Sequence, residues 1–218
     1  HSFPTRRSSD LGNLKKILVT GCGGQVGTEL VAHLRGLYGD ANVMASDFRA
    51  QEGHSGPFAL LDVRDGKAVA ALLDSFKPDT VMHLAGILSA RGEERPQQLW
   101  ETNMGGTYNM LEAARERGCA VFFPSSIAAF GPGTPADRTP QDTIQRPTTI
   151  YGVSKVTGEL LGEYYHLKYG LDVRGVRFPG LISYEALPGG GTTDYAVHIY
   201  YEAQLPRSEE RRVGKECR

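Results

Sequence analysis

Short apolar runs alternate with longer amphipathic segments along the chain from Leu14 to Pro206. A short run that is apolar throughout is typical of a strand buried in a parallel sheet, whereas apolar residues that recur on one face indicate a helix. The predicted strands are Lys15–Thr20, Asn42–Ser46, Phe58–Val63, Thr80–Ala85, Ala120–Pro124 and Val173–Phe178. The predicted helices are Thr28–Leu37, Asp65–Phe76, Gln97–Arg117 and Tyr151–Tyr169. Because strands separated by helix-length segments form right-handed βαβ units, this order predicts an α/β fold with one doubly wound parallel sheet.

The two ends of the chain carry a different signal. His1–Leu11 can be encoded by a nucleotide string whose reverse complement translates as Arg207–Glu216, and this string resembles a common sequencing adapter. A pair of basic interaction arms, the alternative interpretation, predicts no such relation between the ends. We therefore expect adapter-like, non-native tails at 1–11 and 207–218 around a natural domain at 12–206. Such tails imply a cut gene, so we expect the C-terminal substrate-binding portion to be largely missing.

Composition narrows the possible partners and compartment. A chain of 218 residues with 40% hydrophobic content can bury a substantial core, and no apolar run is long enough to cross a membrane. Its formal net charge of -1 gives no general electrostatic reason to bind nucleic acid or an anionic membrane. Cys22, Cys119 and Cys217 match neither a metal site nor an even disulfide framework, which favours a reducing, cytoplasmic location. The histidines have no partner at ligand spacing, so no metal site is predicted.

Three glycines follow the first predicted strand directly and open the first helix. In this arrangement Gly21 permits the tight turn, Gly24 lets the backbone approach a pyrophosphate, and Gly27 lets helix and strand pack closely. The helix N-terminus, with Gln25 and Val26 in the turn, offers unpaired N–H groups and a positive dipole end to phosphates. The turn therefore predicts a dinucleotide site of the Rossmann type.

An acidic residue at the end of the second strand predicts which dinucleotide binds. A carboxylate at Asp47 would accept hydrogen bonds from the adenosine ribose and repel a 2′-phosphate, so NAD is favoured over NADP. The alternative is that Asp47 is a simple turn residue, and Arg49 nearby would weaken a preference for NAD. Cys22, also in the glycine turn, is interpreted as a small packing residue, although the helix N-terminus would lower the pKa of its thiol.

Tyr151 and Lys155 lie on one face of the last long predicted helix. A free tyrosine has a pKa of about 10, but a neighbouring ammonium and a cationic nicotinamide ring both favour the phenolate, which can act as a base. Ser126 closes the fifth strand and is predicted to hold a substrate hydroxyl between itself and Tyr151. The pair alone is weak support, because such residues are common at exposed helix ends. The order of glycine turn, acid, Ser126, Tyr151 and Lys155 favours an enzyme.

From Lys15 to about Ala203, this order resembles the extended branch of the short-chain dehydrogenase/reductase family, which includes NAD-dependent epimerases and dehydratases. The resemblance implies that Ser126, Tyr151 and Lys155 are catalytic. It also implies a homodimer through the helices Gln97–Arg117 and Tyr151–Tyr169. The cofactor contacts that it implies beyond the glycine turn and Asp47 are Asp62 and Val63 at the adenine, Leu84, Ala85 and Gly86 after the fourth strand, Asn103 behind the site, and Pro179 near the nicotinamide.

Within this family, several segments are similar to short-chain L-threonine 3-dehydrogenases. They are Pro124–Pro132, Gln145–Pro147, Ile150–Lys155 and, most specifically, Pro188–Ala196. This likeness implies further substrate contacts at Ser89, Gly180 and Thr192. One departure is Ser126, where these enzymes usually have threonine; both residues offer a hydroxyl.

The implied reaction is oxidation of L-threonine at its β-carbon to 2-amino-3-oxobutanoate, with hydride passing to NAD. Without the C-terminal portion, we expect this chain to bind NAD weakly and to be inactive. Two other functions remain open. A sugar-nucleotide epimerase or dehydratase would use the same three catalytic residues. A non-catalytic NAD-binding regulatory module would share the fold, but the pair Tyr151 and Lys155 counts against it.

Overall fold

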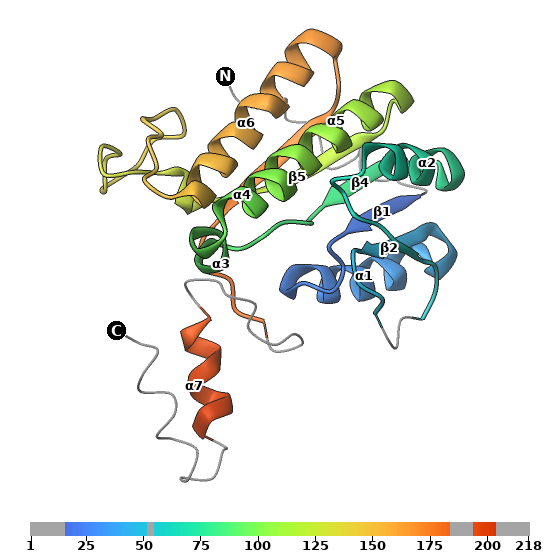
Figure 1. Ribbon diagram of the computed structural model, residues 1–218, viewed down its shortest axis with the longest axis horizontal. Coiled ribbons are helices and arrows are strands. Elements are labelled where there is room, and N and C mark those ends of the chain that lie inside the picture. Colours follow the sequence, from blue (N-terminus) through green and yellow to red (C-terminus); the bar gives the residue numbers. More distant parts are fainter. Residues whose placement is uncertain (1–15, 52–54, 184–193, 204–218) are drawn as a thin grey trace.

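The computed structural model describes residues 16–51, 55–183 and 194–203, and it contains one six-stranded parallel sheet. The strand order is β3-β2-β1-β4-β5-β6 (Figure 1), which confirms the predicted doubly wound fold. The strands are β1 (Ile17–Thr20), β2 (Val43–Asp47), β3 (Phe58–Leu60), β4 (Thr80–His83), β5 (Ala120–Ser126) and β6 (Val173–Phe178).

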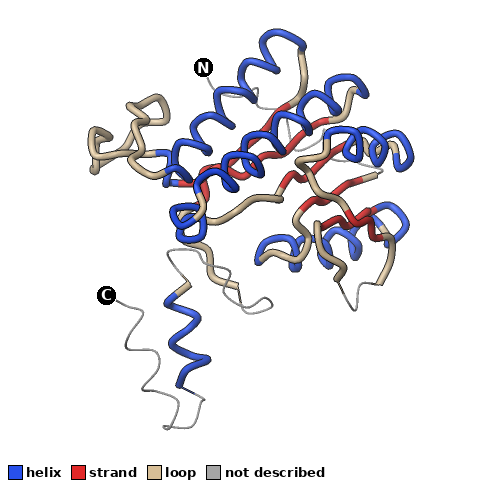
Figure 2. The backbone as a smooth tube through the Cα atoms, viewed as in Figure 1, coloured by secondary structure: helices blue, strands red, loops and turns tan. Residues whose placement is uncertain are grey.

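Helices flank this sheet on both faces (Figure 2). The helices of the described residues are α1 (Gln25–Tyr38), α2 (Gly66–Phe76), α3 (Ser89–Glu94), α4 (Pro96–Leu99), α5 (Gly106–Arg117), α6 (Ile150–Tyr169) and α7 (Tyr195–Ala203), of which α1, α2, α5 and α6 cover the faces of the sheet. A π-helical turn, Trp100–Gly105, joins α4 to α5, and short 3₁₀ turns are found at Asp40–Asn42 and Ile127–Ala129. None of the helices in the described ranges is both long and apolar enough to cross a membrane.

The core has two parts because side chains alternate between the faces of a strand. Leu18 of β1 belongs to the cluster covered by α2, α5 and α6, whereas its neighbours Ile17 and Val19 pack into a second cluster beneath α1. Figure 1 shows α2, α5 and α6 in a row along the first face. On the second face α1 packs over β1 and β2, and Val176 of β6 remains 47% exposed.

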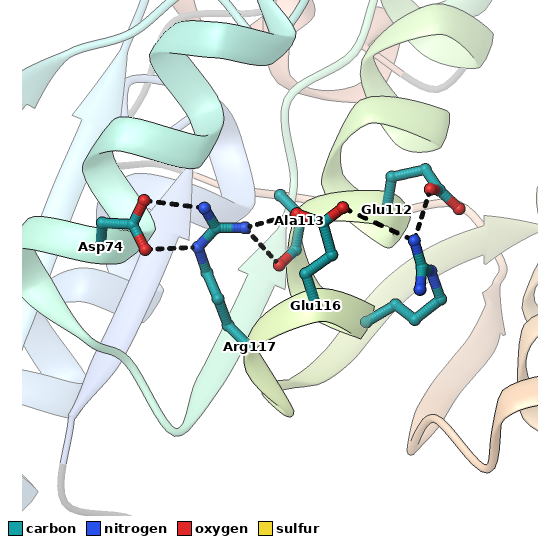
Figure 3. Close-up of polar contacts among 6 residues, drawn as sticks. Asp74, Glu112, Ala113, Glu116 and Arg117 are labelled. Carbon is teal, nitrogen blue, oxygen red and sulfur yellow. Dashed lines mark hydrogen bonds and ion pairs between the residues drawn. The ribbon is translucent and has the colours of Figure 1, made fainter.

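At the amino end of the sheet, an ion pair joins α2 to the C-terminus of α5. The guanidinium of Arg117 donates from Nε and Nη2 to the two carboxylate oxygens of Asp74, at 2.8 and 2.7 Å (Figure 3). Its Nη1 also donates to the carbonyl oxygen of Ala113. These contacts fix the helices at the end opposite to the carboxyl ends of the strands, where sheets of this topology bind ligands.

Several boundaries differ from the sequence prediction. The first helix begins at Gln25 rather than Thr28, because the glycine turn leads directly into it with Gly24 as N-cap. The third strand ends at Leu60 rather than Val63, and the predicted helix Gln97–Arg117 is divided by the π-helical turn. The helices α3 and α7 were not predicted. The predicted tails and residues 184–193, including Thr192, lie outside the described residues.

Candidate active site

The three glycines of the turn meet different constraints. Gly21 has a φ of +70°, and a Cβ there would lie 2.7 Å from the backbone nitrogen of Ala85. A Cβ on Gly27 would lie 2.3 Å from the carbonyl oxygen of Gly21. On Gly24, by contrast, the nearest atom would be 3.4 Å away. The protein's own packing therefore requires Gly21 and Gly27 to be glycine, whereas Gly24 keeps open the approach to its backbone, which is the position predicted for the pyrophosphate.

The N-terminus of α1 provides the matching electrostatics. Its N-cap, Gly24, has no side chain to accept a hydrogen bond from the first turn, and that turn contains no acidic residue. The positive end of the helix dipole is therefore left for an anion. Of the two predicted residues in this turn, Val26 is half-buried and Gln25 donates from Nε2 to Oδ1 of Asp194 at 3.3 Å.

Asp47 ends β2 with its carboxylate against the glycine turn. Oδ2 accepts a hydrogen bond from the backbone nitrogen of Gly23 at 3.0 Å, and Oδ1 accepts one from the backbone nitrogen of Arg49 at 3.3 Å. The guanidinium carbon of Arg49 lies 4.7 Å from the ring centroid of Phe48. Asp47 is therefore an oriented acceptor beside the phosphate turn, where a ribose binds in this fold, and these residues fit NAD.

Cys22, in the glycine turn, is buried in the core. Cys22 has no exposed surface, and burial, followed by the negative charge of Asp47, raises its pKa to about 11. The side chain packs into the core beside Val31, as expected of a small packing residue, and burial outweighs any lowering by the helix N-terminus.

The residues predicted to border the adenine lie after β3. Arg64 donates to the carboxylate of Asp62, from Nε to both oxygens at 3.0 Å, and lowers the pKa of that carboxyl. Val63 is buried, its carbonyl oxygen accepts a hydrogen bond from Nδ2 of Asn109 at 3.0 Å, and a Cβ on Gly106 would lie 2.6 Å from its Cγ2. The helix α5 therefore holds this segment in place.

The loop after β4 contains the predicted residues Leu84, Ala85 and Gly86, and it is held from two sides. The backbone nitrogen of Ala85 donates to Oγ1 of Thr20 at 3.2 Å. Asn103, buried in the π-helical turn, accepts from the backbone nitrogen of Ile87 at 2.7 Å and donates to its carbonyl oxygen at 3.0 Å. Its side chain therefore shapes the loop from behind. A π-helical turn at such a position is common near functional sites.

Lys155 is hydrogen-bonded to the backbone near the end of β5. Its Nζ donates to the carbonyl oxygen of Pro124 at 2.7 Å and lies 4.9 Å from the ring centroid of Phe123 and 5.2 Å from that of Tyr151. Burial lowers the pKa of Lys155 to about 8, and the negative charge of Glu159 opposes that shift. The ammonium therefore lies beneath the tyrosine ring at neutral pH.

The structure brings Tyr151 and Ser126 together. Burial raises the pKa of Tyr151, and a hydrogen bond with Ser126 opposes the rise. Among the protein groups desolvation has the largest effect on Tyr151, so the lower pKa expected from Lys155 together with a cationic nicotinamide ring stays a prediction for the NAD complex. Oγ of Ser126 also accepts from the backbone nitrogen of Ala128 at 3.1 Å, which orients the hydroxyl.

The remaining predicted substrate and nicotinamide contacts lie at the carboxyl edge of the sheet or outside the described residues. Ser89 begins α3 and is half-buried, and Pro179 and Gly180 are exposed directly after β6. Glu159, whose side chain accepts hydrogen bonds from Arg177, was not among the predicted residues. The sequence feature that could have indicated its role is the spacing of four residues from Lys155, which places both on one face of the helix.

Three comparisons place this site among known proteins. Residues 17–203 match the model of the NAD dependent epimerase/dehydratase family. An uncharacterized epimerase/dehydratase from Staphylococcus saprophyticus is 58% identical over 194 residues, which cover 87% of this chain and 61% of the relative. The structure of L-threonine dehydrogenase from Clostridium difficile superposes with a TM-score of 0.84 at 56% identity, again over 87% of this chain and 61% of the other.

A structure with a different catalytic activity is less similar. UDP-glucose 4-epimerase from Thermus thermophilus, in complex with NAD, superposes with a TM-score of 0.66 at 29% identity, over 74% of this chain and 54% of the other. These likenesses confirm the predicted family resemblance, and the NAD dependence of the family confirms the predicted cofactor. The chain spans 61% of the length of the two more similar proteins.

Proposed function

This chain belongs to the NAD-dependent epimerase/dehydratase family, and from that premise we propose that the whole protein oxidises L-threonine at its β-carbon to 2-amino-3-oxobutanoate. The convergence of Ser126, Tyr151 and Lys155 at the end of β5 carries the proposal, because it provides a hydroxyl-binding group, a base and a cation at one place. The choice of substrate is supported by the much closer likeness to L-threonine dehydrogenase than to UDP-glucose 4-epimerase.

In the proposed mechanism, Oγ of Ser126 and the phenol of Tyr151 hold the β-hydroxyl of the substrate between them. Tyr151, as phenolate, accepts the hydroxyl proton, and Lys155 supplies positive charge below its ring. NAD, when bound, supplies the acceptor for the hydride that leaves the β-carbon. The half-buried setting of Lys155 and Tyr151 holds the reacting groups in place, which is a large part of the rate advantage that an enzyme gains.

The same proposal assigns the remaining predicted residues. Gly21, Gly24 and Gly27, with Gln25 and Val26, would hold the pyrophosphate, and Asp47 the ribose. The adenine would lie against Asp62 and Val63, the loop Leu84–Gly86 would line the cofactor with Asn103 behind it, and Pro179 would lie near the nicotinamide. Ser89, Gly180 and Thr192 would contact L-threonine.

We also propose that the protein forms a homodimer through α5 and α6. The two helices lie side by side on the outer surface (Figure 1). Large apolar or aromatic side chains are exposed on them or on the adjoining π-helical turn: Trp100, Tyr108, Leu160, Tyr164 and Leu167. An apolar surface of this kind supports a protein interface, and a two-fold symmetric pair would bury both copies of it. Sedimentation of the whole protein tests this, and a monomer would contradict it.

The main alternative is a sugar-nucleotide epimerase or dehydratase that uses the same three side chains. The two functions are separated by supplying the whole protein with NAD and either L-threonine or UDP-glucose. We expect NADH to accumulate with L-threonine, and no turnover of UDP-glucose. Epimerisation of UDP-glucose without net NADH would instead establish the alternative, and NAD binding without either reaction would favour a regulatory module.

A further inference from the structure

Tyr151, Lys155 and Glu159 occupy successive turns on one face of α6. Each of these three side chains makes a hydrogen bond to the last residues of β5. The pairs are Tyr151 with Ser126, Lys155 with the carbonyl oxygen of Pro124, and Glu159 with the hydroxyl of Ser125. The helix is therefore fixed in one register over the strand that carries Ser126.

Glu159 is held as a carboxylate by several donors. Nε and Nη2 of Arg177, on β6, donate to its two oxygens at 2.9 and 2.8 Å, and Nε2 of Gln145 donates to Oε2 at 2.9 Å. Both charged side chains are largely buried, with 14% of Glu159 and 18% of Arg177 exposed. Burial raises the pKa of Glu159, but the hydrogen bonds from Arg177, Ser125 and Gln145 together lower it. The negative charge therefore persists next to Lys155.

The charged and titratable groups around Lys155 come from three elements. His83 of β4 is buried, and desolvation, followed by the charge of Lys155, lowers its pKa to about 4, so it is neutral at physiological pH. Tyr151 and Glu159 face Lys155 from its own helix, and Arg177 lies beyond Glu159 on β6. Of these groups, Glu159 is the one that opposes the loss of charge on Lys155.

We propose that Glu159, held by Arg177, is a positioning residue that keeps Lys155 charged and seated on Pro124 beneath Tyr151. This inference deepens the proposed function and rests on it for the role of Lys155. The electrostatic effect of Glu159 on Lys155, however, belongs to the chain and can be tested without substrate or cofactor. Arg177 also donates to the carbonyl oxygen of Gln141 at 3.2 Å, so the same pair fixes the loop between β5 and α6.

The test is an NMR titration of the Lys155 side chain in chain labelled with ¹³C at the lysine ε-carbons. The signal is assigned by its absence in Lys155→Arg. In Glu159→Gln, which keeps the size of the side chain but removes its charge, we expect the titration of Lys155 to move to lower pH. Glu163→Gln, one turn further along α6, removes the same charge at a greater distance from Lys155 and should leave the titration unchanged.

For a second variant we expect the titration of Lys155 to shift in the opposite direction. Arg177→Gln removes a positive charge and leaves the carboxylate of Glu159, so the titration of Lys155 should move to higher pH. Opposite shifts are difficult to produce by a general loosening of the fold. If Glu159→Gln does not fold, the double variant Glu159→Gln/Arg177→Gln replaces it, because it leaves no unpaired buried charge, and its Lys155 should titrate at lower pH than in Arg177→Gln. An unchanged titration in either folded variant, or a downward shift in Arg177→Gln, would overturn the proposal.

The whole protein adds a readout that separates this inference from the proposed function. Since a lysine loses its charge above its pKa, kcat for L-threonine in Glu159→Gln should begin to fall at lower pH than in the unaltered enzyme, with little change in KM. Opposite titration shifts in a protein that does not oxidise L-threonine would reject the proposed function and leave the electrostatic role of Glu159 intact. Oxidation of L-threonine with no shift in the titration of Lys155 would support the proposed function and reject the electrostatic role of Glu159.

Discussion

The Nζ atom of Lys155 lies 2.7 Å from the carbonyl oxygen of Pro124, two residues before Ser126. This one contact joins α6 to the carboxyl end of β5 and thereby determines where Tyr151 stands relative to Ser126. The same bond places the ammonium 5.2 Å from the ring centroid of Tyr151, so Lys155 contributes positive charge beside a phenol whose pKa burial raises. A backbone carbonyl oxygen therefore helps to position the side chains of this site.

The first prediction concerns the base. Tyr151→Phe removes the phenol oxygen but keeps the ring beside Lys155, so NAD should still bind while NADH formation from L-threonine falls by about 10²–10⁴-fold, the usual contribution of a general base. Stopped-flow or steady-state absorbance of NADH in the whole protein measures this. Tyr38→Phe, at the end of α1 away from the site, is the control. Turnover retained in Tyr151→Phe would reject the mechanism.

The second prediction concerns cofactor choice. Asp47→Asn removes the negative charge that is oriented by Gly23. NAD should bind about 10–100-fold more weakly, because a hydrogen bond to a charged group contributes about 1.5–3 kcal/mol. NADP should lose less, since its 2′-phosphate no longer meets a carboxylate. Calorimetric titration with both nucleotides checks this, with Asp40→Asn, on an exposed turn, as the matched control.

The third prediction concerns the glycine turn, where one substitution should affect mainly NAD binding and another mainly the stability of the fold. Gly24→Ala should lower the free energy of unfolding by no more than about 1 kcal/mol, because its Cβ would have room and the loss is that of a poorer N-cap, yet it should weaken NAD binding. Gly21→Ala should cost more than about 1–2 kcal/mol, because alanine is strained at positive φ and its Cβ would meet Ala85. Urea unfolding and NAD titration of both variants are the measurements. Equal destabilisation by the two substitutions would contradict this division of roles.

The sequence was sufficient to predict the sheet and most of the candidate site. Apolar runs of strand length identified all six strands, and the glycine turn, Asp47 and the pair on α6 lie where the pattern placed them. These features are local, since each depends on residues that are close in sequence. The start of α1 at Gln25 was missed because glycines have low helix propensity, although the turn itself supplies the N-cap.

Features that depend on distant contacts were not predictable in the same way. The π-helical turn forms where Asn103 binds the loop after β4, and no periodicity of the segment indicates that contact. The role of Glu159 depends on Arg177, which comes from a different strand. The raised pKa of Tyr151 results from burial, which the spacing of Tyr151 and Lys155 does not express.

The fourth prediction uses His83 as a reporter of the packed site. Its Nδ1 is hydrogen-bonded to Oγ1 of Thr20 at 3.0 Å, the ring is 1% exposed, and burial, followed by the charge of Lys155, lowers its pKa from 6.5 to about 4. The unfolded chain therefore binds a proton between these two values that the folded chain does not bind. Stability should be fully present above about pH 6.5 and should fall by about 3 kcal/mol as the pH drops to about 4.

Urea unfolding at a series of pH values measures this loss, and His83→Asn identifies its source. Asparagine can still bond to Thr20 but does not titrate, so the variant should be less stable at neutral pH and should lack this part of the acid-dependent slope. His33→Asn, on the exposed surface of α1, should keep the full slope. If His83→Asn loses stability with falling pH as steeply as the unaltered chain, another group is responsible, and the ring of His83 is not held neutral next to Lys155.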